Sequence, residues 1–238
     1  MTAGLSGDRV KTPQTIAEQV YDLLRKRIIE QQIKPGERLL EVAICESLNV
    51  SRTPVREAFR LLQQDGLVER IPQGGIRVTG LSLEELREIT TLRTVLEVHA
   101  VEMACDLIEE HEIETLEQIV EQAATLVAAA NEGKVIDLDE LSRLNTVFHD
   151  TICAAARSSY LGKILDIVRM PILRFRPFSL VDREHRLRGV EEHRRMVDML
   201  RRQDKEGLKQ LTAKHVGDVS KAVARILSST QANRGIAA

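Results

Sequence analysis

The sequence predicts a mostly α-helical fold in two parts: three helices with a hairpin, followed by an all-α six-helix bundle. Apolar residues recur at helical spacing along most of the 238 residues. One short region breaks this pattern, because β-type runs at 67–71 and 76–79 enclose the turn sequence PQGG. From 82 to 229 there is almost no strand signal and there are only two prolines, so this part is predicted to be helical.

Composition and charge are typical of an ordinary globular protein. Hydrophobic residues make up 43% of the chain and charged residues 29%, and no apolar run reaches the roughly 18 residues of a membrane span. The start, MTAGLSGDRVKT, has no apolar signal region, and the three cysteines are scattered. We therefore expect a cytoplasmic protein with reduced thiols. The net charge is −2, but residues 1–80 hold 12 Lys and Arg against 10 Asp and Glu, so the first part is mildly basic.

The first part is expected to span 13–80, after a flexible arm at 1–12. A first helix is predicted at 15–31 and ends before the turn sequence KPG. A second, short helix fits 41–48, and Asn-Val breaks it from a third helix at 51–64. The order is therefore helix, helix, helix, hairpin within about 65 residues.

The helix at 51–64 has one apolar and one basic face. Ser51 is a good N-cap, and Pro54 lies in the first turn, where its missing N–H is tolerated. The core-facing positions are Val55, Ala58, Phe59 and Leu62. The opposite face carries Arg52, Arg56, Arg60 and Gln63.

Two helices joined by a tight break and followed by a hairpin predict a winged helix-turn-helix. The second helix of such a unit fits the major groove of DNA, where an arginine fork pairs with the O6 and N7 of guanine. Ser51 and Thr53 are expected to donate to phosphates, and the backbone at Gly74 can approach DNA closely. The simpler alternative is a solvated helix face whose arginines pair with Glu57 or Asp65.

The second part, 81–230, is predicted to be a bundle, with a frayed tail at 231–238. Its breaks fall near Gly133, Ser158, the stretch 171–180 and Asp204. Six helices are expected, at 82–109, 112–131, 137–156, 158–174, 183–203 and 205–228.

The stretch PGERLLEVAICESLNVSRTPVREAFRLLQQDGLVER resembles the winged-helix DNA reader of the GntR family of bacterial transcription regulators. The resemblance covers about 13–80. It implies that Arg52, Thr53, Arg56 and the wing-tip Gly74 contact the operator. Ser51 and Arg38 are further candidates for phosphate contacts.

The second part resembles the FCD effector domain of the FadR subgroup of that family, and its six-helix count resembles the VanR-like branch. The resemblance rests on RTVLEVHA, LNTVFHDTI and EEHRRMVDMLRRQDKEGLKQLTAKHV. In metal-binding FCD domains four positions are Asp, His, His and His, which correspond here to Asn145, His149, His193 and His215. Three imidazoles from three helices suit Zn²⁺, with Ni²⁺ or Mn²⁺ as alternatives. Asn145 in place of Asp removes one negative charge and is expected to weaken metal binding.

The resemblance also implies that Arg93 holds the carboxylate of a small effector near the metal. The alternative is an ion pair with Glu97, four residues along the same helix. Arg174 and Arg176 are weaker candidates for the pocket. The other histidines, His99, His111 and His185, are expected to be structural or surface groups.

The prediction is therefore a DNA-binding transcription regulator, a repressor released by a small organic acid bound near a metal. Apolar stripes beyond those needed for one core suggest a homodimer, which would read a near-palindromic operator. Two alternatives stay open. One is a metal-dependent hydrolase or lyase built on His149, His193 and His215. The other is a DNA-binding protein whose helical part binds no metal.

Overall fold

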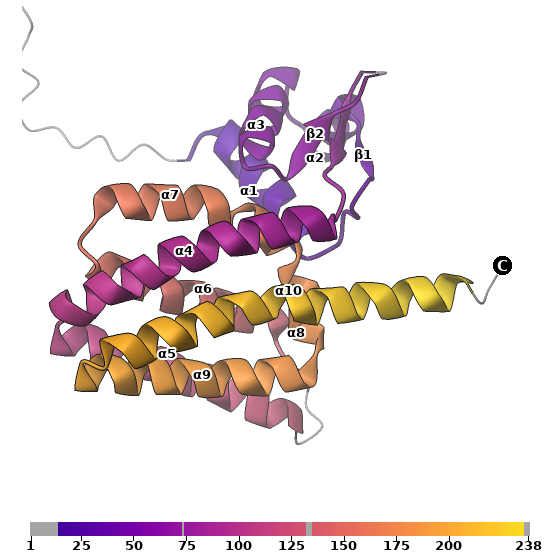
Figure 1. Ribbon diagram of the computed structural model, residues 1–238. Helices are drawn as coiled ribbons and strands as arrows, with labels where there is room; N and C mark the ends of the chain where they lie inside the picture. Colours follow the sequence, from indigo (N-terminus) through magenta and orange to yellow (C-terminus); the bar gives the residue numbers. More distant parts are fainter. Residues whose placement is uncertain (1–13, 73, 132–134, 236–238) are drawn as a thin grey trace, which may run out of the picture. The chain divides into compact units, whose positions relative to one another are not determined.

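The computed structural model describes residues 14–72, 74–131 and 135–235 (Figure 1). The arm expected at 1–12 lies outside this range, as do residues 236–238 of the expected tail. The chain forms two compact units. One comprises the residues up to Ile28 together with 32–79, and the other comprises Ile29–Gln31 together with the chain from Gly80 onward.

Three helices and a small sheet make up the first unit. A three-stranded antiparallel sheet has the order β1-β3-β2, with Val68 opposite Val78 and Leu39 opposite Ile76. The strand β1 was not predicted, because two residues are too few for a periodic signal. The elements are α1 (Ile16–Ile29), β1 (Arg38–Leu39), α2 (Glu41–Leu48), α3 (Arg52–Gln64), β2 (Val68–Arg70) and β3 (Ile76–Val78).

The core of the first unit lies between α1, α3 and the sheet. The four residues predicted to face inward from 51–64 are all buried. Asn49 takes a left-handed conformation (φ 51°) between α2 and α3, and the N–H of Val50 closes the turn on Cys45. This break, which the sequence predicted, turns the chain sharply so that α3 presents its basic face outward.

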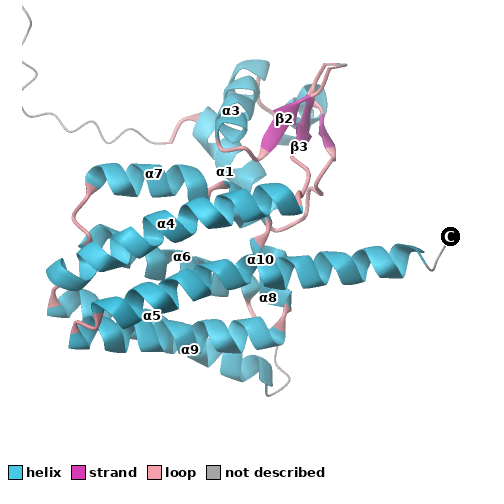
Figure 2. Cartoon of the chain, viewed as in Figure 1, coloured by secondary structure: helices cyan, strands magenta, loops and turns pink. Residues whose placement is uncertain are grey.

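The second unit is all helical within the part of the chain that the structure describes (Figure 2). Side chains of Ser82, Asp137, Ser158 and Asp182 cap four of its helices by accepting backbone N–H groups. The helices are α4 (Leu83–Leu107), α5 (Glu110–Asn131), α6 (Leu138–Ala155), α7 (Ser159–Arg169), α8 (Arg176–Val181), α9 (Arg183–Arg202) and α10 (Lys205–Gly235), with a 3₁₀ turn at Pro171–Arg174. The mostly α-helical fold class is confirmed.

The bundle differs most from the prediction after Arg169 and at its C-terminal end. The helix expected over 158–174 ends at Arg169, and the expected break at 171–180 contains a 3₁₀ turn and the additional short helix α8. Proline explains both, because Pro171 opens the 3₁₀ turn and another proline lies in the first turn of α8. The last helix also continues beyond 228, to Gly235.

The long helices α4 and α10 pack along each other, and α5, α6 and α9 complete the core (Figure 1). Arg174 is 1% exposed and ties the 3₁₀ turn to the start of the unit. It donates to the carbonyls of Gly80 (3.3 Å) and Pro171 (3.2 Å) and pairs with Glu85. Arg174 is therefore a structural residue.

We expect Leu62→Ala to lower the free energy of unfolding of the first unit by about 2–5 kcal/mol, because it empties a fully buried site on α3. Gln63→Ala, on the exposed side of the same helix, should change it by less than about 0.5 kcal/mol. Urea unfolding of the full chain followed by circular dichroism measures both. Equal midpoints for the two variants would contradict the assignment of Leu62 to the core.

Candidate DNA interface and metal centre

The N-terminal end of α3 is an exposed polar surface. Ser51, Arg52, Thr53 and Arg56 are all exposed, and Ser51 occupies the N-cap position without a capping hydrogen bond from its side chain. The Ser51 hydroxyl is therefore available to a phosphate, next to backbone N–H groups at the start of α3.

The arginines of this surface contact one acidic residue of α2. Arg56 Nε donates to Glu41 Oε2 at 2.8 Å, and Arg52 Nε lies 3.8 Å from Glu41 Oε1. The hydrogen bond with Arg56 lowers the pKa of Glu41, so this carboxylate is charged. Because the pair is exposed, it holds Arg56 only weakly, and DNA can replace Glu41 as its partner.

The turn between β2 and β3 presents open backbone. Gly74 has φ 80° and Gly75 φ 106°, conformations that favour glycine. A Cβ on Gly74 would meet nothing within 4 Å, so this backbone is open to an approaching DNA strand. Arg38 Nη2 donates to the carbonyl of Gly74 at 2.9 Å. Arg38 therefore supports the wing tip from β1.

A groove of about 460 Å³ joins α3 to this turn. It brings Arg56 and Gly74, both predicted as DNA contacts, to one surface. Arg70, at the end of β2, also lines it and was missed from the sequence, because a lone strand arginine carries no motif. Arg60 lines the groove too, but it pairs with Glu57 (2.6 Å), which is the helix-face pairing considered as an alternative.

In the second unit three histidines from three helices converge. His149 of α6, His193 of α9 and His215 of α10 are buried, and one potential ligand atom from each lies within 4.8 Å of the others. The Nε2 atoms of His193 and His215 are 3.1 Å apart. Side chains far apart in the chain therefore form one compact nitrogen cluster.

Two buried carboxylates orient these rings. Glu97 Oε2 lies 3.1 Å from Nδ1 of His149, and Glu192 Oε2 lies 2.9 Å from Nδ1 of His215. Each contact engages Nδ1 and leaves Nε2 of the same ring to another partner, as carboxylates do behind metal-binding histidines; in His215 this Nε2 faces His193. Sequence reasoning assigned neither role. Glu97 was considered only as a partner of Arg93.

Burial keeps two of these three histidines neutral. It lowers the pKa of His149 to about 4 and that of His193 well below its usual value. Burial alone would raise the pKa of Glu97, but Arg93, His149 and Arg169 hold it well below its usual value. Neutral imidazoles with charged carboxylates behind them are a donor set that fits a divalent metal ion.

Asn145 lies one turn before His149 on α6. It lines a cavity that the three histidines also line. Among the residues that the structure describes, its amide forms no hydrogen bond, so its oxygen is free to act as a ligand. As a neutral group it contributes no charge to a bound cation.

This cavity encloses about 60 Å³ and is cationic. Its lining includes three arginines and four histidines and no acidic residue: Arg93, Arg176, Arg186, His149, His185, His193 and His215. His185, expected to be structural or a surface group, is therefore part of the cavity wall.

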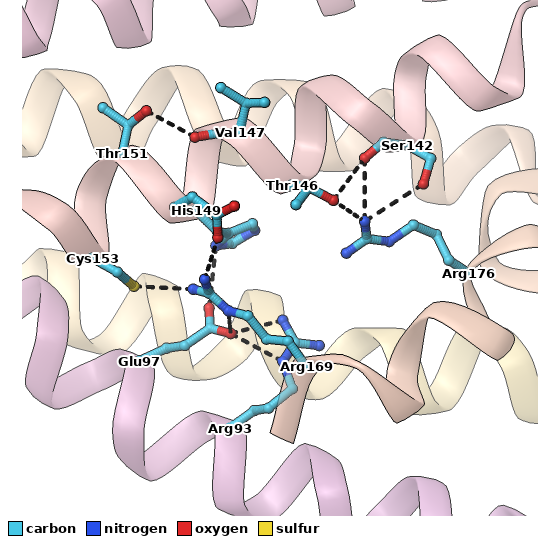
Figure 3. A network of polar contacts seen from close by, with 11 residues as sticks. Arg93, Glu97, Ser142, Thr146, Val147, His149, Thr151, Cys153, Arg169 and Arg176 are labelled. Atoms are coloured by element: carbon cyan, nitrogen blue, oxygen red, sulfur yellow. Dashed lines mark hydrogen bonds and ion pairs between the residues drawn. The ribbon is translucent and has the colours of Figure 1, made fainter. Parts of the chain in front are cut away.

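Arg93 both lines the cavity and forms the predicted alternative ion pair. Its Nε and Nη2 donate to one oxygen of Glu97, at 3.0 and 2.8 Å, and Arg169 reaches the same oxygen at 3.4 Å (Figure 3). Its Nη1 makes no hydrogen bond within the described chain. Arg93 is thus largely neutralised by Glu97.

Arg176 differs from Arg93 in having only neutral partners. It donates to the Ser142 carbonyl at 3.2 Å and to the Thr146 hydroxyl (Figure 3). Burial, together with the charges of Arg93 and Arg169, lowers its pKa to about 9. The sequence suggested Arg176 only weakly, because it lies in the stretch expected to be a break.

Both units of the chain match known protein families, and the fold has counterparts among solved structures. The family model "Bacterial regulatory proteins, gntR family" matches residues 16–78, and that of the FCD domain matches 88–218. The Bacillus subtilis regulator YdhC is 31% identical over 90% of this chain and 94% of its own. The gluconate operon transcriptional repressor of the same organism is 31% identical over 74% of this chain and 68% of its own. Escherichia coli McbR/YncC has the same fold, with a TM-score of 0.73 at 21% identity over 92% of this chain and 100% of its own.

These findings decide between the functional classes considered from the sequence. The matching families and the named relatives are transcription regulators, so the hydrolase or lyase alternative is wrong. No helix in the described parts of the chain is long and apolar enough to cross a membrane. The chain belongs to the GntR family of bacterial regulatory proteins, with an FCD domain that follows the DNA reader in the sequence, and is a DNA-binding transcription regulator.

Proposed function

We propose that the protein is a repressor whose operator binding is controlled by a small carboxylate bound near a divalent metal in the helical unit. The observation that carries this is the cluster of three buried histidines on the wall of a cavity that no acidic residue of the described chain lines. The repressor assignment is supported by a relative that is named as a repressor. A regulator that binds DNA would act in the bacterial cytoplasm.

On the DNA side, Arg52 and Arg56 would read base edges in the major groove, and Ser51 and Thr53 would donate to phosphates. The open backbone at Gly74 would follow the neighbouring sugar–phosphate chain. Arg38 would act mainly by supporting the wing tip, since its guanidinium already bonds the Gly74 carbonyl.

In the helical unit, His149, His193 and His215 would hold the metal, with the amide oxygen of Asn145 as a fourth, weaker ligand. Three buried nitrogens favour Zn²⁺, with Ni²⁺ or Mn²⁺ as alternatives. A bound cation would offer a coordination position to a carboxylate oxygen. Arg93 would use its free Nη1 to orient that carboxylate, while Glu97 keeps its guanidinium in place.

Release from DNA requires two copies. Two readers would contact the two halves of a near-palindromic operator, and the acid would have to bind one arrangement of the readers better than the other. An exposed apolar strip on adjacent helices supports a homodimer: Leu92 and Val95 of α4 are 49% and 66% exposed, and Ile164 and Ile167 of α7 are 47% and 72% exposed. A second copy of the same strip would cover it.

Arg56→Ala is expected to weaken binding to a selected operator by about 1–3 kcal/mol, because it removes a bidentate contact to a base. Arg202→Ala, which removes the same charge from the exposed end of α9, should leave binding within error. Fluorescence anisotropy at fixed salt measures both. Equal affinities for Arg56→Ala and the unchanged protein would show that α3 is not the reader.

Removing metal by chelation should lower the melting temperature, and one of Zn²⁺, Ni²⁺ or Mn²⁺ should restore it. A ligand specific to the folded state adds about 2.7 kcal/mol at a hundred times its dissociation constant. His193→Ala should melt at the same temperature with or without metal, whereas His111→Ala, on the surface of α5, should respond like the unchanged protein. No response to any metal in the unchanged protein would favour the metal-free alternative.

Replacing both Val95 and Ile167 by Glu should convert a dimer into single chains of 26.8 kDa, because charges would enter the apolar strip. Light scattering after size exclusion measures the mass. The control is a double Glu substitution at Ala154 and Arg202, both exposed positions outside the strip. A dimer that survives the Val95 and Ile167 changes would place the interface elsewhere.

A further inference from the structure

The distribution of charge in the effector cavity points beyond a single carboxylate. Three arginines line the cavity, and no acidic residue does. They differ in how far their charge is already balanced by the protein. The arginine whose charge remains unbalanced is the one that a ligand must satisfy.

The positive charge of Arg93 is balanced by a carboxylate of the protein, and that of Arg176 is not. Glu97 accepts two hydrogen bonds from Arg93. By contrast, Arg176 donates only to Ser142 and Thr146, and no carboxylate of the described residues lies within ion-pair distance of it (Figure 3). A partly buried guanidinium without a counter-ion is costly unless an anion joins it.

Arg186 adds a second unsatisfied donor on the same wall. One of its terminal nitrogens donates to the carbonyls of Leu180 and Val181, the latter at 2.9 Å. Its Nε is buried and has no partner within the described chain. Buried N–H groups without partners are rare and often mark the place of an absent ligand or water.

Asn145 also leaves positive charge in the cavity without a balancing negative charge. Its side chain lines the cavity and is a neutral amide, so it adds no negative charge there. A metal held by the three histidines would therefore have no carboxylate among its protein ligands, next to an arginine that also lacks a counter-ion. One monocarboxylate cannot balance both.

We infer that the effector is a small dicarboxylate, with one carboxylate near the histidine cluster and Arg93 and the second on Arg176 and Arg186. This rests on the proposed control by a carboxylate and specifies its class. Figure 3 shows that Arg176 and the group around Glu97 are separate sets of contacts. Arg176 reaches Ser142 and Thr146, whereas Arg93, Arg169 and His149 gather around Glu97.

The test is calorimetric binding to the full-length, metal-supplied protein at neutral pH and constant ionic strength. The probes are malonate, succinate and glutarate, each compared with the monocarboxylate of equal carbon number: propionate, butyrate and valerate. At least one dicarboxylate should bind about tenfold to a hundredfold more tightly than its monocarboxylate. In Arg176→Gln this preference should fall to about threefold or less, with monocarboxylate affinity retained.

Arg202→Gln is the matched control, because it removes the same charge from an exposed position on α9 and should keep the full preference. If Arg176→Gln does not fold, Arg186→Gln provides the second variant and should lose part of the preference. Melting curves of each variant without ligand check the fold independently of binding.

Equal binding of monocarboxylates and dicarboxylates, or a preference that survives in Arg176→Gln, would overturn the dicarboxylate inference and leave control by a carboxylate standing. If neither series binds, both the inference and the carboxylate effector are wrong. Operator binding by the same samples shows separately whether the reader is intact.

Discussion

The buried carboxylate of Glu97 is the group on which the interior of the second unit depends. It is 2% exposed, and it receives Arg93 from its own helix, Arg169 from α7 and His149 from α6. Desolvation of a carboxylate is expensive, and these three partners keep it charged. In turn, it leaves Nε2 of His149 free toward the other two histidines. The orientation of His149 and the position of Arg93 therefore depend on one acidic side chain.

The same kind of ion pair has a different consequence in the DNA reader. Arg56 and Glu41 lie 2.8 Å apart, as close as Arg93 and Glu97, but they are exposed to water. Water and salt screen the surface pair, so Arg56 can exchange Glu41 for a phosphate or a base. The buried pair cannot be opened without leaving a charge alone in the interior. Burial thus separates a binding surface that must exchange partners from a cluster that must keep its geometry.

The short segment after α7 shows how local chain geometry assigns roles to neighbouring residues. Arg174 and Arg176 are two positions apart, and the sequence does not distinguish them. Pro171 ends the preceding helix and starts a 3₁₀ turn, which directs Arg174 toward Gly80 and Glu85. Arg176 begins α8 and lines the cavity instead. One arginine secures the fold, and the other leaves a positive charge for a ligand.

The sequence alone determined the helical fold, the reader and its exposed arginines, because helical periodicity, turn residues and the motif around Arg52 and Arg56 are local signals. It also singled out the three histidines, through their resemblance to a known pattern. Only the tertiary structure decided that Glu97 and Glu192 orient them, that β1 completes the sheet, and that Arg176 rather than Arg93 lacks a counter-ion. Those facts depend on contacts between side chains of helices that are far apart in the sequence, and on the burial of those side chains. No local sequence pattern predicts such contacts.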